Sequence, residues 1–278
     1  MALILKYSIY RFRPFSPGDY DLYKRVVALK SSDSDLKVLI SYGGYNFGSW
    51  TFTQIANSTS ARSKFISGAL KLIEEYNLDG LDLDWEYPSG VVSLHAALSK
   101  KNRGTYPLLP PPNFKYCVSL KKAPFKEHTQ TVSSYDYIFL MSYDLHGSWE
   151  LNTDMHAKLR EKSGGGIYNT ICDMIKSGGK ETTETTAVGA YMSQGTNWHG
   201  YDNPASIKIK MEWILKEGYA GAFIWALDTD DFNGKHCGKG TYPLMNAINE
   251  GLGGAVLPET TTKTPGQVRK RFKLFERY

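Results

Sequence analysis

The chain has 278 residues, of which 41% are hydrophobic and 13% aromatic, and its formal net charge is +5 at pH 7. This length is sufficient for one large hydrophobic core, so the sequence predicts a single main domain. Much of the positive charge lies near the carboxyl end, which does not indicate a nucleic-acid-binding protein. No apolar run approaches the roughly 18 residues of a membrane span, so no membrane association is predicted.

The amino-terminal residues and the cysteines do not decide the cellular compartment. Residues 1–5 are apolar but too short for the hydrophobic region of a signal peptide, so no export signal is predicted. The three cysteines, Cys117, Cys172 and Cys237, leave at least one thiol unpaired and show no metal-ligand spacing. The six histidines also lack metal spacing, and no metal site is predicted.

Predicted strands and helices alternate through the first half of the chain. The hydrophobic pattern predicts strands over 3–10, 36–41, 81–86 and 114–120, and helices over 19–30 and 61–76. Ser60 is the predicted N-cap of the second helix. Residues 88–113 carry several prolines and no regular pattern.

The second half continues this alternation. Strands are predicted over 137–143, 187–192 and 219–226, and helices over 166–176, 204–218 and 242–250, while 181–186 is a polar segment of low complexity. Pro204 at a first helical position and Gly218 just after the last turn mark the ends of one helix. Seven strands that alternate with helices predict an α/β fold with a parallel sheet.

The stretch from Asp79 to Pro88 carries the strongest chemical signal. Four acidic residues lie between Asp79 and Glu86, and Asp82, Asp84 and Glu86 alternate with apolar residues. This period of two predicts a strand with the three carboxylates on one face, about 7 Å apart. Since ionised carboxylates in a partly buried site repel one another, the set is expected to share protons and to keep one acid protonated.

A calcium loop and a solvated strand edge are the alternative interpretations of this stretch. A calcium loop uses glycine, asparagine and backbone oxygens in an irregular turn, whereas here leucines and a tryptophan separate the acids. The pattern therefore favours acid–base chemistry on a strand.

The stretch from Asp79 to Glu86 resembles the catalytic signature of glycoside hydrolase family 18, the chitinases and their lectin-like relatives. Further motifs resemble those of the family's third, sixth and eighth barrel strands: Ser41-Tyr42-Gly43-Gly44, Met141-Ser142-Tyr143-Asp144, and the segment from Gly221 to Phe232. Four motifs in family order make a chance match implausible. The resemblance covers most of residues 3–254.

The resemblance implies a (β/α)8 TIM-barrel fold over 1–254, followed by a Thr/Pro-containing basic tail over 255–278 that is expected to be disordered. Aligned to the family, the chain is expected to lack the first strand and to keep only a segment such as 198–203 of the usual insertion domain. The family counterpart of Cys237 pairs with a cysteine in that insertion domain, so Cys237 is predicted to be unpaired.

The resemblance also assigns catalytic roles. Glu86 is expected to protonate the glycosidic oxygen, and Asp84 to orient the substrate's N-acetyl group, whose oxygen attacks the anomeric carbon in this family. Asp82 would hold the proton that Asp84 releases, and Tyr143 would donate a hydrogen bond to the acetamido oxygen. No cofactor is implied.

Four residues are predicted to bind substrate. Asp144 resembles a residue that binds sugar hydroxyls, with a turn-forming aspartate as the alternative. Trp225 would form the floor under the reacting sugar ring, with a core tryptophan as the alternative. Tyr7 and Met141 are expected either to line the site or to pack in the core.

The resemblance therefore predicts an endo-acting, retaining chitinase that binds chitin or chitooligosaccharides. The alternative is a lectin-like protein on the same fold with little or no turnover, because the barrel would be incomplete. Family relatives are mostly secreted, and Asn57-Ser58-Thr59 is a glycosylation sequon, so an extracellular location is expected although no signal peptide is visible. The oligomeric state is not predicted.

Overall fold

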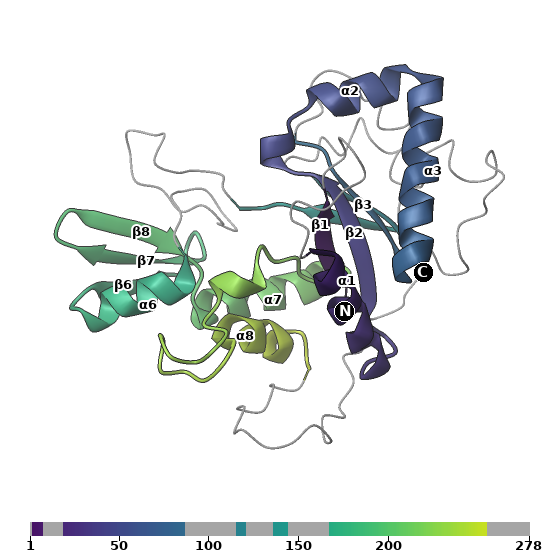
Figure 1. Ribbon diagram of the computed structural model, residues 1–278. Coiled ribbons are helices and arrows are strands. Elements are labelled where there is room, and N and C mark those ends of the chain that lie inside the picture. The colour runs from purple at the N-terminus through teal and green to yellow at the C-terminus, as the bar shows by residue number, and fades with distance from the viewer. Residues whose placement is uncertain (1, 8–18, 87–114, 121–135, 144–166, 255–278) are drawn as a thin grey trace. The chain divides into compact units, whose positions relative to one another are not determined.

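In the computed structural model the chain forms two compact units, residues 1–141 and 142–278 (Figure 1). The residues that the structure describes are 2–7, 19–86, 115–120, 136–143 and 167–254. Each unit has its own sheet, and each is described by itself.

The first unit is built on a parallel sheet. Its strands are β1 (Ala2–Tyr7), β2 (Lys37–Gly43), β3 (Gly80–Asp84), β4 (Lys115–Leu120) and β5 (Tyr137–Leu140), and among the described residues they pair in the order of the sequence. The helical segments are α1 (Asp19–Ala28), η1 (Leu29–Ser31), η2 (Tyr45–Phe47), α2 (Trp50–Asn57) and α3 (Thr59–Tyr76). The alternation of strand and helix that the sequence predicted is confirmed here.

Helix α3 covers β2 and β3 with an apolar stripe. Its buried side chains include Phe65, Ile66, Ala69 and Ile73, and the Phe65 ring packs edge-on against Tyr42 of β2 at 5.3 Å between centroids. These residues recur at helical spacing, so one face of the helix meets the sheet.

The N-cap of α3 is Ser58, and the prediction of Ser60 was wrong. The Ser58 hydroxyl oxygen accepts a hydrogen bond from the Ala61 N–H at 3.2 Å. Ser58 has an extended backbone, which an N-cap residue requires, whereas Ser60 is already inside the helix. Two serines so close together give the same local signal, and the backbone conformation decides between them.

The second unit contains an antiparallel sheet of three strands among its described residues. These are β6 (Lys180–Glu184), β7 (Gly189–Gln194) and β8 (Asn197–Tyr201), and the helical segments are α6 (Tyr168–Lys176), α7 (Pro204–Glu217), η3 (Leu227–Thr229) and α8 (Pro243–Gly251). Helix α6 packs on one side of the sheet, with Tyr168, Ile171 and Cys172 against Ala190, Met192 and Tyr201.

One sequence expectation in this unit was wrong. The polar segment 181–186 was not predicted to be a strand, but it contributes most of strand β6, because its threonines suit a sheet and pair with β7. The three strands and the turns between them run over residues 180–201.

The predicted strand over 219–226 does not form in the described part of the chain. These residues are assigned to no helix or strand before η3. They have apolar and aromatic residues typical of a strand, but a strand also needs a hydrogen-bonded neighbour, which no sequence pattern supplies.

Helices α7 and α8 pack side by side in the second unit. Ile207 and Met211 of α7 meet Ala247 and Ile248 of α8. Pro204 is the first residue of α7, as the sequence predicted, and the Asn203 side chain caps the helix. Within the described residues, no helix combines the length and the apolar character that crossing a membrane demands.

Candidate active site

Asp79, the first acid of the stretch, lies just before β3 and has a structural role. The Asp79 carboxylate accepts a hydrogen bond from the Val38 N–H at 2.8 Å and pairs with Lys30 at 2.9 Å. Its backbone N–H donates to the Val38 carbonyl, also at 2.8 Å. Asp79 therefore fixes the start of β3 against β2, which separates it from the three acids that follow.

Asp82 and Asp84 are buried on β3, with 1% and 5% of their surfaces exposed. The Ser41 hydroxyl, itself 2% exposed, donates a hydrogen bond to Asp82 Oδ2 at 2.6 Å. This contact follows from the parallel register, which places Ser41 opposite Asp82. The hydroxyl stabilises negative charge on a carboxylate that has little access to water.

Glycines at the end of β2 allow this strand to approach Asp84. Gly43 lies opposite Asp84 with φ of 119°, and a Cβ added there would lie 2.0 Å from the Asp84 carbonyl oxygen. The next residue, Gly44, donates its N–H to the same oxygen at 2.8 Å. Only glycine fits position 43, because both the space and the backbone conformation exclude a side chain.

Glu86 lies two residues beyond the end of β3 and is partly exposed. Trp85 between them is 2% exposed and stacks on Phe52 of α2, with ring centroids 5.3 Å apart. The apolar anchor of Trp85 holds the backbone, so that Glu86 is the member of the three carboxylates that reaches solvent. An acid in that position can transfer a proton to an external molecule.

The sixth-strand motif divides between the two units. Met141 is 5% exposed and belongs to the first unit, which favours a packing role. Tyr143 belongs to the second unit, where its ring stacks on Phe223 at 6.1 Å between centroids. Asp144 lies outside the described residues, and Tyr7 lies on β1 opposite Tyr42.

Trp225 lies in an irregular segment and is 54% exposed. The prediction that it ends a strand was therefore wrong within the described residues. Its exposure argues against a core tryptophan. A cis peptide bond joins it to Ala226.

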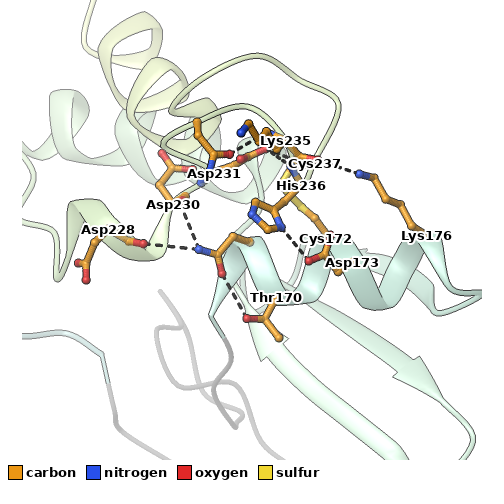
Figure 2. A network of polar contacts seen from close by, with 12 residues as sticks. Thr170, Cys172, Asp173, Lys176, Asp228, Asp230, Asp231, Lys235, His236 and Cys237 are labelled. Carbon is orange, nitrogen blue, oxygen red and sulfur yellow. Dashed lines mark hydrogen bonds and ion pairs between the residues drawn. A yellow bond between two sulfur atoms is a disulfide. The ribbon is translucent and has the colours of Figure 1, made fainter.

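The loop that follows Trp225 is tied to α6 by contacts that the sequence did not predict (Figure 2). Cys237 forms a disulfide with Cys172, so the prediction of an unpaired Cys237 was wrong. His236 Nδ1 lies 2.7 Å from Asp173 Oδ2, and Lys176 Nζ donates to the Lys235 carbonyl at 3.1 Å. The partner cysteine was visible in the sequence, but only the packing of α6 brings it to Cys237, 65 residues away.

Two buried aspartates of this loop were also missed. Asp230 is 4% exposed, and its carboxylate accepts hydrogen bonds from the Leu244 and Met245 N–H groups, both 3.1 Å from Oδ2. Burial raises the pKa of Asp230 above its ordinary value, and the backbone hydrogen bonds oppose that effect. Asp231 is fully buried, and its Oδ2 accepts from the His236 and Cys237 N–H groups at 3.0 and 2.7 Å.

A second polar cluster lies where the antiparallel sheet meets α7. Glu181 Oε1 accepts from the Tyr201 hydroxyl at 2.6 Å and from Asn203 Nδ2 at 3.0 Å. Burial and the nearby Glu181 raise the pKa of Tyr201. The cluster fixes β8 and the cap of α7, which is a structural task. In the described ranges, no group of three His, Cys, Asp or Glu side chains is placed to hold a metal ion.

Comparison with known proteins places these features in a family. The family description "Glycosyl hydrolases family 18" matches residues 9–180 and 160–230. An endochitinase of Brugia malayi is 39% identical over 91% of this chain, and the chain spans 66% of that protein's length, just under two thirds.

Solved structures agree on the fold. An immunomodulatory active chitinase from Trichuris suis has a TM-score of 0.77 at 27% identity, with 86% of this chain and 87% of that chain covered. Human YKL-39, described as a pseudo-chitinase with retained chitooligosaccharide binding properties, has a TM-score of 0.76 at 22% identity, with 90% and 99% covered. The predicted (β/α)8 fold class is confirmed by these likenesses.

Proposed function

We propose that this chain, which belongs to glycosyl hydrolases family 18, hydrolyses β-1,4 bonds between N-acetylglucosamine units of chitin or chitooligosaccharides. The observation that carries the proposal is the graded exposure of the three carboxylates: Asp82 and Asp84 are buried, and Glu86 reaches solvent at the end of the same stretch. A hydrolase of this type needs a proton donor that meets substrate and a buried partner that stabilises charge.

The proposed reaction uses no protein nucleophile. Glu86 donates its proton to the glycosidic oxygen, and the bond from that oxygen to the anomeric carbon breaks. The acetamido oxygen of the substrate attacks the same carbon and forms a cyclic oxazolinium ion. Water then opens this ion, returns a proton to Glu86 and leaves the configuration at the anomeric carbon retained.

Asp84 and Asp82 are proposed to stabilise the oxazolinium ion. Two carboxylates buried on one strand face repel each other if both are ionised, so a proton shared between them lowers the free energy of the resting state. When positive charge develops on the substrate, the proton moves toward Asp82, and Asp84 turns its negative charge to the acetamido N–H. The hydrogen bond from Ser41 keeps Asp82 in one orientation throughout.

Substrate contacts are proposed for five further residues. Tyr143 would donate to the acetamido oxygen, Asp144 would bind sugar hydroxyls, and Trp225 would form the apolar floor under the reacting ring. The exposed indole of Trp225 supports this last role. Met141 and Tyr7 are proposed to line the site, although the burial of Met141 favours packing.

A chitooligosaccharide-binding protein with little turnover is the second candidate. The observation that favours it is that the segment 219–226 forms no strand in the described part of the chain, so the backbone that carries Trp225 does not end a described barrel strand. Human YKL-39, a pseudo-chitinase with retained chitooligosaccharide binding properties, is such a protein. Retention of Glu86 favours the enzyme.

We also propose that the chain works in an oxidising compartment outside the cytosol. The Cys172–Cys237 disulfide supports this proposal, because disulfides persist chiefly in secreted and extracytoplasmic proteins. Asn57 of the sequon is exposed at the end of α2, as a glycosylated asparagine must be.

The test replaces Glu86 by glutamine, which keeps the shape of the side chain but has no proton to donate. We expect Glu86→Gln to abolish turnover of chitooligosaccharides while their dissociation constant stays within about threefold. Glu74→Gln, on the exposed surface of α3, is the matched control and should leave both quantities unchanged. Undiminished hydrolysis by Glu86→Gln would remove Glu86 from the mechanism, and binding without turnover in the unaltered chain would favour the second candidate.

A further inference from the structure

One side chain holds the residue that follows Trp225 from both sides. The Thr229 hydroxyl donates to the Ala226 carbonyl at 2.6 Å and accepts from the Ala226 N–H at 3.3 Å. The Thr229 N–H donates to the same carbonyl at 3.0 Å. Both backbone groups of Ala226 are therefore satisfied by a residue three positions later, in a segment that forms no strand within the described residues.

The turn closed by Thr229 is itself anchored to two helices. Next to it, the buried Asp230 carboxylate accepts from the first-turn amides of α8. The Asn169 side chain of α6 donates to the carbonyls of Asp228 and Asp230, at 3.5 Å each. These contacts fix the turn relative to α6 and α8.

The anchor continues through Asp231 to the disulfide. Asp231 accepts from the amides of His236 and Cys237, and Cys237 is bonded to Cys172 of α6. On the other side of Trp225, residues 219–222 are exposed. Between that segment and the indole, Ile224 packs against the α7–α8 cluster and Phe223 stacks on Tyr143. Trp225 is therefore held on both sides, and the turn closed by Thr229 fixes it from the carboxyl side.

We propose that Thr229 is a positioning residue for Trp225: its hydroxyl locks Ala226 and so orients the indole on a turn that Asp230 and Asp231 anchor. This inference rests on the proposed function, in which Trp225 is the floor under the reacting sugar ring. A threonine suits the task because its hydroxyl is both donor and acceptor, and both capacities are used here.

The first test observes Trp225 directly and needs no substrate. The full chain is labelled with 5-fluorotryptophan, and the Trp225 signal among the six tryptophans is assigned by its loss in Trp225→Phe. Thr229→Val has the shape of threonine without the hydroxyl, and it should shift and broaden the Trp225 resonance. Thr229→Ser keeps the hydroxyl and should leave the resonance as in the original chain. If Thr229→Val proves unstable, Thr229→Ala replaces it.

The second test measures chitooligosaccharide hydrolysis, where Thr229→Val should lower kcat/KM about tenfold, since small displacements of a substrate-contacting group cost that much or more. Thr229→Ser should restore the rate. In a Trp225→Ala background, Thr229→Val should have no further effect, because a residue that acts through the indole has nothing left to position. A merely structural residue would give additive losses in that cycle.

The outcomes separate the two hypotheses. An unchanged Trp225 resonance in Thr229→Val and Thr229→Ala overturns the positioning role, whatever the activity. If the Trp225 resonance shifts in Thr229→Val but Trp225→Ala hydrolyses substrate at the original rate, the positioning role is upheld and the proposed use of Trp225 in catalysis is refuted. A shifted resonance with additive rate losses overturns the claim that Thr229 acts through Trp225.

Discussion

The acidic strand of the first unit and the Trp225 loop of the second hold their functional side chains in opposite ways. On β3, the parallel ladder with β2 fixes Asp82 and Asp84, and the Ser41 hydroxyl of the adjacent strand donates to Asp82. At Trp225 no ladder is described, and a turn, two aspartates and a disulfide take its place.

This difference teaches where each part is vulnerable. Backbone pairing on β3 is shared among many hydrogen bonds, so one side chain can change and the strand persists. The Trp225 loop depends on a few individual contacts, so the loss of one of them should disorder more of the loop than the loss of one side chain disorders β3. The following predictions test that contrast, from the largest expected effect to the smallest.

Removal of the disulfide should give the largest loss of stability. The bond closes a span of 65 residues, and the loop-closure relation gives about 4 kcal/mol for a loop of this length. We expect Cys172→Ser with Cys237→Ser to lower the free energy of unfolding by up to that amount in urea titrations. The reduced original chain should have the same midpoint as the double variant, and Cys237 should resist thiol labelling before reduction.

The double cysteine variant should lose local stability in the Trp225 loop and not in the acidic strand. In hydrogen exchange, amides of 228–243 should lose protection in the double variant, whereas those of β2 and β3 should keep theirs. Equal loss in both regions would contradict the contrast between them.

Asp84→Asn should lower kcat by a factor on the order of 10², about 2.7 kcal/mol, because the amide cannot stabilise the oxazolinium charge. Asp79→Asn is the matched control on the same stretch. Asp79 binds Val38 and Lys30, so its loss should affect thermal stability and leave kcat nearly unchanged. A loss of binding without loss of rate in Asp84→Asn would contradict the assigned role.

Ser41→Ala should cost about 1–2 kcal/mol of stability, because it removes the hydroxyl that donates to the buried Asp82. The turnover rate should also fall, since Asp82 would lose its fixed orientation. Ser60→Ala, at an exposed position of α3, serves as the control and should be close to neutral in urea unfolding.

Asp230 should give the smallest effect, a dependence of stability on pH. Burial raises its pKa in the folded chain above the ordinary value of 3.8, so folding disfavours the ionised form. Its contribution to stability is therefore fully present below pH 3.8 and is lost as the pH rises through the folded pKa. Urea unfolding of the original chain and Asp230→Asn, compared between pH 3 and 7, should show the difference in unfolding free energy falling with pH. A difference that rises with pH would contradict the assignment.

Much of the first unit was predictable from the sequence. The alternation around Asp82 and Asp84 identifies the acidic strand, and the stripe of Phe65 and Ile73 identifies the covering helix, because both signals are periodic and local. The register that brings Ser41 to Asp82 was not predictable, since it depends on how two strands align across 41 residues of chain.

The sequence by itself determined the acidic strand, its motifs and most helices, since these depend on neighbouring residues and on periods of two or 3.6. Tertiary structure decided the rest. Cys172 and Cys237 meet because α6 packs beside the loop, and the threonines of β6 become a strand because β7 lies next to them. Residues 219–226 form no strand within the described part of the chain, although their sequence is typical of one. Each of these outcomes depends on which distant segment lies alongside, and that is a property of the packed chain rather than of any one stretch.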